Sequence, residues 1–130
     1  MAPSGLAPAR ISFVIKKLIY LSMGKKGIKK MTALAMGTKD VPKEVCDVTK
    51  MMMSHFTPRM GSLPTFEYEA LRKLSMPVLY MAGSRDQLLQ SQKSADRLKS
   101  LAPTSDIRII DRGHAIFDIG KDLADYFESI

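Results

Sequence analysis

The chain has 130 residues, of which 45% are hydrophobic and 25% are charged, a length that suits one domain and a balance that excludes a wholly disordered chain. No stretch approaches the roughly 18 consecutive apolar residues of a membrane span. The N-terminal "MAPSGLAPAR" also lacks the basic region and apolar core of a signal peptide, so we expect a cytoplasmic protein.

The net charge of +7 is concentrated in the first half of the chain. Residues 1–65 carry 11 Lys and Arg against 3 Asp and Glu, a balance of +8, whereas residues 66–130 carry 9 against 10, a balance of −1. The lysines gather in "GKKGIKK", which forms either a solvated helical surface or a contact with an anionic membrane or protein surface. We expect no nucleic-acid binding, because no aromatic residues interleave with these lysines.

The apolar spacing in the first half predicts helices and no strand. The first helix is expected over residues 9–23, followed by a turn that Gly24 and Gly27 bracket. A second helix is expected over residues 28–36, and Gly37 should end it.

A third helix should begin after Asp40, the expected N-cap. Its apolar stripe consists of Val45, Val48, Met52 and Phe56. The neighbouring methionines, Met51 to Met53, are polarisable and flexible, and they suit either a lipophilic substrate or a loosely packed helical core. We interpret Cys46, the single cysteine, as structural, and His55 as a surface or packing residue.

The second half changes to an alternation of strands and helices. "FEYEALRKL" predicts a short helix, and "PVLYMA" is an apolar run of strand length that Gly83 ends. A helix follows over 91–101, with Ser91 as its expected cap and Ala95 and Leu98 facing inward. "DIRII" predicts the second strand, and a final helix is expected over 117–130, with Leu123, Phe127 and Ile130 on one side. This order is typical of an α/β unit with parallel strands.

Two residues that can carry acid–base chemistry follow these two strands. Asp86 comes after the first strand and His114 after the second, and open α/β sheets place their sites at the carboxyl ends of the strands. A carboxylate there can orient an imidazole, which can then take a proton from a nucleophile. The alternatives are a turn-forming Asp and a core or capped histidine, while Asp111 and Asp118 are rival partners for His114.

The run from Leu74 to Ile130 resembles the C-terminal end of the α/β-hydrolase family. "PVLYMAGSRD" matches a Pro-led strand that ends in Gly-x-x-Asp, and "DIRIIDRGH" matches the short strand and Gly-His that follow it. The resemblance implies that Asp86 is the acid of a catalytic triad and that His114 is its general base. "MAPSGLAP" resembles the end of the strand before the family's cap. The implied fold is therefore a partial α/β-hydrolase, with a helical cap-like segment over 1–65 and a core segment over 66–130.

The nucleophile of that family lies in a Gly-x-Ser-x-Gly turn, and these 130 residues contain no such pentapeptide. Ser84 and Cys46 are poor substitutes. The resemblance thus implies the C-terminal part of a serine hydrolase for ester or similar acyl substrates, inactive or nearly so by itself, with the serine expected upstream of Met1.

We expect no metal and no other cofactor, and a small-molecule acyl substrate, which is lipophilic if Met51 to Met53 line its site rather than a helical core. Unpaired strand edges predict self-association or pairing with the missing N-terminal half. The alternative function is a non-catalytic basic helical module that binds an anionic membrane or protein surface.

Overall fold

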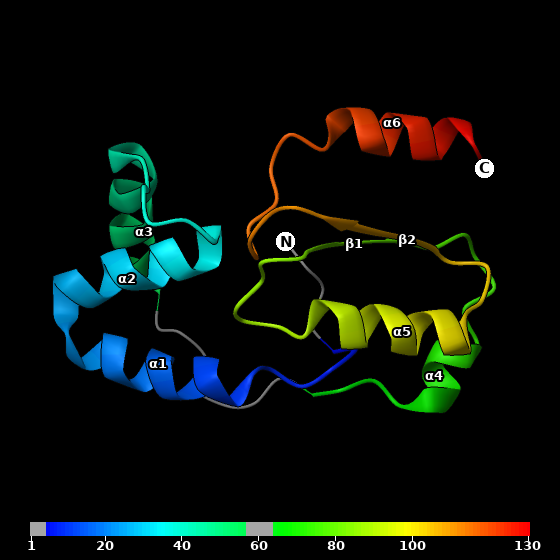
Figure 1. Cartoon of the computed structure of the whole chain (residues 1–130), viewed down its shortest axis with the longest axis horizontal. Coiled ribbons are helices and arrows are strands. Elements are labelled where there is room, and N and C mark those ends of the chain that lie inside the picture. The colour runs from blue at the N-terminus through cyan, green and yellow to red at the C-terminus, as the bar shows by residue number, and fades with distance from the viewer. Residues whose placement is uncertain (1–4, 57–63) are drawn as a thin grey trace.

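The computed structural model describes residues 5–56 and 64–130. In chain order, the elements of these residues are α1 (Ile11–Ser22), α2 (Gly24–Met36), α3 (Lys43–His55), α4 (Tyr68–Arg72), β1 (Leu79–Gly83), α5 (Ser91–Leu101), β2 (Asp106–Ile110) and α6 (Gly120–Glu128). Helices α1 to α3 form one group, and the remaining elements form a second group around the strands (Figure 1). None of the described helices is long and apolar enough to cross a membrane.

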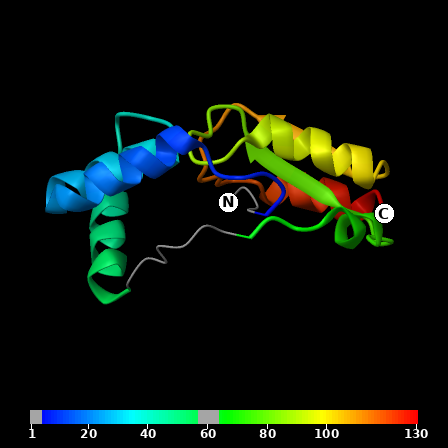
Figure 2. The ribbon, with the colours of Figure 1, turned by 90° about the horizontal axis from the view of Figure 1, so that it is seen from below.

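The two strands form a parallel pair in which Leu79 lies opposite Asp106 and Gly83 lies opposite Ile110. Helix α5 connects them and lies on one face of the pair, whereas α6 lies on the other face (Figures 1 and 2). The predicted class, α/β with parallel strands, is confirmed, and α5 and β2 have the predicted bounds. Both strands end at the same edge, which therefore brings the two loops that follow them together.

The core lies where α5 packs on the strands. Ala95 and Leu98 of α5 are buried, as expected, against Tyr80 and Ala82 of β1. Tyr80 also donates a hydrogen bond from its hydroxyl to the carbonyl of Ser91 at 3.1 Å. Ser91 was expected to cap α5, but it is the first helical residue and makes no side-chain cap hydrogen bond. The expectation was wrong because α5 already begins at Ser91, so that Gln90 occupies the N-cap position.

Gly27 lies inside α2, so the expected turn between Gly24 and Gly27 is wrong. The chain reverses at Met23, and α2 begins at Gly24, whose φ is +56°. A Cβ at Gly27 would lie 2.7 Å from the carbonyl carbon of Tyr20 in α1. The glycine therefore serves the close approach of two helices. Gly37 ends α2 in the left-handed conformation, as predicted.

The expected cap of α3 is also wrong, and most of its apolar stripe is exposed. The helix begins at Lys43 after Pro42, with no side-chain cap, so Asp40 lies outside it. Val48, Met52 and Phe56 are 52%, 55% and 70% exposed. Cys46 is instead the buried residue of this helix, which fits its structural interpretation. Spacing shows that a helix has an apolar side, but burial depends on which neighbour covers that side.

The last helix is shorter than predicted. Asp118 has a φ of +58°, a conformation that interrupts a helix, and α6 begins only at Gly120. Tyr126 is the residue that α6 buries, whereas Phe127 and Ile130 are 67% and 66% exposed. Two of the three residues expected on one side of this helix are therefore exposed.

Candidate active site

The structure brings Asp86 and His114 together at the carboxyl edge of the strand pair. Oδ2 of Asp86 lies 2.9 Å from Nδ1 of His114. The Asp86 side chain is fully buried, and that of His114 is 16% exposed. The contact follows from the parallel register, because Gly83 and Ile110 lie opposite each other immediately before the two loops.

The second carboxylate oxygen of Asp86 holds its own loop in place. Oδ1 accepts hydrogen bonds from the backbone N–H groups of Leu88 at 2.7 Å and Leu89 at 3.0 Å. This is the local arrangement of a turn-forming Asp. The two readings of Asp86 therefore do not compete, because one oxygen forms the turn and the other binds the imidazole.

These contacts decide the charge of the carboxyl. Burial by itself raises the pKa of Asp86, but the hydrogen bonds from His114, Leu89 and Leu88 outweigh it, and the pKa is lowered from 3.8. Asp86 is therefore ionised at neutral pH.

The ionised carboxylate also fixes the tautomer of the imidazole. A carboxylate only accepts hydrogen bonds, so Nδ1 of His114 must carry the proton that joins the two groups. Nε2 of a neutral ring is then an acceptor. Within the part of the chain that the structure describes, no protein group hydrogen-bonds to Nε2. This tautomer is the one that a general base requires.

The rival residues are engaged elsewhere. Asp111 pairs with Nε of Arg85 at 2.8 Å, and its side chain is 80% exposed. Asp118 forms the bend before α6. Ser84 donates its hydroxyl to Asp111 at 3.5 Å, and Cys46 is buried in α3. His55 is exposed at the end of α3.

Three glycines, not singled out from the sequence as site residues, hold the His114 loop against its neighbours. A Cβ at Gly83 would lie 2.8 Å from the carbonyl carbon of Arg112, and one at Gly37 would lie 2.8 Å from Cα of Gly113. Gly113 is therefore enclosed between the end of β1 and the end of α2. Ala115 adds a backbone hydrogen bond from its N–H to the carbonyl of Ala35 in α2 at 2.9 Å. Helix α2 therefore contacts the loop that carries His114 directly.

A hollow of about 450 Å³, here called the acid hollow, adjoins Asp86. Its lining comes from the start of α1, the end of α2 and the loop after β1, and consists of Arg10, Ser12, Gly37, Ser84, Arg85, Asp86 and Gln87. Among the described residues, no group of three or more His, Cys, Asp or Glu side chains could hold a metal ion.

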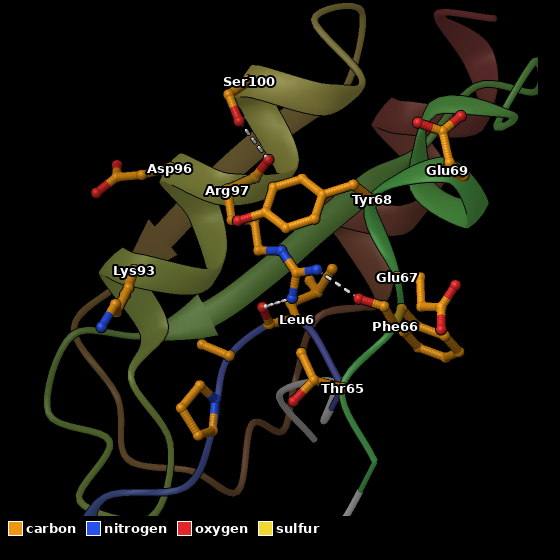
Figure 3. A pocket seen from close by; sticks show the side chains of 12 residues that line it. Leu6, Thr65, Phe66, Glu67, Tyr68, Glu69, Lys93, Asp96, Arg97 and Ser100 are labelled. Atoms are coloured by element: carbon orange, nitrogen blue, oxygen red, sulfur yellow. Dashed lines mark hydrogen bonds between the residues drawn. The ribbon is translucent and has the colours of Figure 1, made fainter.

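Another hollow, of about 920 Å³, lies away from this pair (Figure 3). Arg97 of α5 extends across it and donates hydrogen bonds to the carbonyls of Leu6 and Phe66. Its guanidinium also lies 4.7 Å from the centre of the Tyr68 ring. Arg97 therefore joins three segments of chain, and neither Asp86 nor His114 lines this hollow.

The pKa of Asp86 predicts a pH dependence of stability. Because folding lowers this pKa below its ordinary value of 3.8, the ionised carboxyl stabilises the folded chain above that value. The contribution is lost as the pH falls through the folded-state pKa. Between about pH 6 and pH 3, the free energy of unfolding should therefore fall more steeply for the natural chain than for Asp86→Asn. Urea unfolding at each pH measures both slopes, and parallel slopes would contradict the assigned charge.

Comparison with known proteins gives a likeness of fold. No family model matches the chain, and no curated protein matches its sequence. Among solved structures, carboxylesterase CesB (YbfK) from Bacillus subtilis is similar with a TM-score of 0.65 and 16% sequence identity. The match covers 96% of this chain and 45% of the esterase, so the chain spans less than half of that protein's length. The likeness supports a distant resemblance to the α/β-hydrolase fold.

Proposed function

We propose that this chain supplies the acid and the base of a serine hydrolase of the α/β-hydrolase type, which cleaves an ester or similar acyl bond. The serine belongs to polypeptide outside these 130 residues. The observation that carries the proposal is the hydrogen bond between Oδ2 of Asp86 and Nδ1 of His114 at the carboxyl edge of a parallel strand pair. In this proposal residues 1–65 form a cap-like segment and residues 66–130 form the core segment.

The proposed chemistry uses the imidazole twice. Nε2 of His114 takes the proton of the serine hydroxyl as the oxygen attacks the acyl carbonyl, and it then returns the proton to the leaving alcohol. The charge that forms on the imidazole is stabilised by ionised Asp86 at 2.9 Å. A water molecule, activated by the same imidazole, releases the acyl group from the serine.

The free edge of β1 offers a position at which further strands of such an enzyme can pair. Among the described residues, β1 pairs only with β2. An apolar hollow of about 390 Å³ lies beside it, lined by Leu74, Val78 and Tyr80 among others. An unpaired strand edge next to open apolar surface favours the addition of further strands. The proposal places the serine-bearing polypeptide there.

The test is a search for the serine. The chain is affinity-tagged and expressed in its native cells, which are treated with a fluorophosphonate probe before purification. We expect the tagged chain to recover a polypeptide that is labelled at the serine of a Gly-x-Ser-x-Gly turn. Replacing His114 by Ala should abolish the labelling and still recover that polypeptide, because the probe needs an activated serine.

His55→Ala is the matched control, because His55 is the other histidine and lies exposed in α3. This variant should retain the labelling. Three outcomes would contradict the proposal: a label on a serine of the chain itself, recovery of no labelled partner, or equal labelling with His114→Ala.

A further inference from the structure

A further hollow, here called the lysine hollow, lies next to the acid hollow. It measures about 460 Å³ and lies between α1, the end of α2 and Gln87. Lys16, Lys30 and Lys39 line it, and no Asp or Glu does. We propose that it binds a small anionic group, carboxylate or phosphate, of the substrate that the Asp86–His114 pair processes. The link to catalysis rests on the proposed function, whereas the binding rests on the geometry of the hollow.

The partners of two of these lysines are neutral. Nζ of Lys16 donates to the side-chain carbonyl of Gln87 at 3.3 Å, and Nζ of Lys30 lies 5.8 Å from the centre of the Tyr20 ring. Neither contact compensates the positive charge. Like charges around one hollow repel each other, and an anion between them replaces this repulsion by attraction. Lysine serves such a site as a mobile point charge, which suits both carboxylate and phosphate.

Two backbone carbonyls at the end of α2 accept hydrogen bonds, so they repel an anion in the lysine hollow less. The C-terminal end of a helix presents carbonyls that repel anions, and α2 ends here. However, the carbonyls of Leu34 and Ala33 accept hydrogen bonds from the N–H groups of Gly37 and Thr38. Oγ1 of Thr38, which also lines the hollow, accepts the N–H of Asp40 at 3.2 Å. Its hydroxyl proton is therefore available to an anion.

The position of the hollow connects it to the acid–base pair. Gly37 and Gln87 line both the lysine hollow and the acid hollow, and Asp86 precedes Gln87 in the chain. A substrate with its anionic end among the lysines extends past these two residues towards the pair. The substrate class is therefore an ester in which one part ends in a carboxylate or a phosphate. The positive balance of residues 1–65 also attracts such a molecule from solution.

The test measures binding to the chain alone, without any catalytic partner. Backbone amide resonances are followed as succinate or inorganic phosphate is added at constant ionic strength. We expect saturable shifts at Gly37, Thr38 and Gln87. The double variant Lys30→Gln/Lys39→Gln should bind at least about tenfold more weakly, because it removes two of the three positive charges that line the hollow.

The matched control removes two charges from the same surface. Lys25 and Lys26 are exposed on α2 and do not line the hollow, so Lys25→Gln/Lys26→Gln should weaken binding less than about twofold at constant ionic strength. Equal weakening by both double variants would overturn the inference, because it would mean diffuse attraction to a basic surface. Shifts that do not saturate, or that spread over α2 without Gln87, would also overturn it.

The assembled enzyme, that is, this chain together with the serine-bearing polypeptide of the proposed function, gives a second readout. We expect Lys30→Gln/Lys39→Gln to lower the ratio of kcat/KM for a succinate monoester to kcat/KM for the corresponding uncharged diester by about tenfold. An unchanged ratio would overturn the inference. The titration of the chain alone does not depend on a serine partner, so a failure of the proposed function and a failure of anion binding remain distinguishable.

Discussion

If this chain belongs to the serine hydrolase proposed above, replacing Asp86 by Asn should lower the turnover of the assembled enzyme by about 10⁴-fold while leaving the chain folded. The amide oxygen of Asn can still accept the N–H groups of Leu88 and Leu89, which now bind Oδ1. The amide nitrogen then faces Nδ1 of His114 and donates to it. The proton of the imidazole moves to Nε2, which can no longer accept the proton of a serine.

Two measurements check this result. Ester hydrolysis by the assembled enzyme gives the loss in kcat, and the ¹⁵N shifts of the His114 ring in the isolated chain report the change of tautomer. Asp111→Asn is the matched control, because it makes the same chemical change in the His114 loop at a carboxylate that pairs with Arg85. It should leave both readouts unchanged. Full turnover with Asp86→Asn would refute the role of Asp86.

Replacing Gly113 by Ala should lower the free energy of unfolding by about 4 kcal/mol or more, a size that point substitutions reach only through mechanisms such as severe steric conflict. The new Cβ would lie 2.5 Å from the backbone nitrogen of Gly37 and closer still to the carbonyl carbon of Met36. These are backbone atoms, so no side chain can rotate away to make room. Either α2 or the His114 loop must move, and the bond between Asp86 and His114 should weaken with it.

Gly120→Ala provides the comparison for this variant. Gly120 is the first residue of α6, and a Cβ there meets no atom within 4 Å. The same substitution should therefore change the free energy of unfolding by less than about 0.5 kcal/mol or raise it slightly. Urea unfolding of the two variants measures both effects. If the two alanine variants had equal stability, the close packing of the three glycines would be refuted.

The strands and their order could be predicted because their signals are local. "PVLYMA" is a short apolar run between Pro77 and Gly83, and "DIRII" forms β2 within the predicted bounds. Parallel pairing then requires that the loops after both strands meet at one edge. This requirement brings Asp86 near His114 but leaves Asp111 and Asp118 as rival partners, and only the resemblance to the α/β-hydrolase family singled out Asp86.

The features that could not be predicted depend on contacts between distant segments. Gly27 was assigned to a turn because glycine often forms turns, whereas its role depends on the carbonyl of Tyr20. Spacing alone also does not show that α6 buries Tyr126 while Phe127 is exposed, because burial depends on which segment packs against the helix. The lysines were read as one basic surface, but tertiary packing places Lys30 beside a hollow and leaves Lys25 outside it.

The contact of α2 with the His114 loop couples the position of His114 to that of the three N-terminal helices. The carbonyl of Ala35 holds the N–H of Ala115, and the end of α2 rests on Gly113. A helical group that swung outward would have to break this hydrogen bond and release the loop that carries His114. Such a movement of α2 would therefore also shift His114 relative to Asp86, so the geometry of this pair depends on the position of the three N-terminal helices.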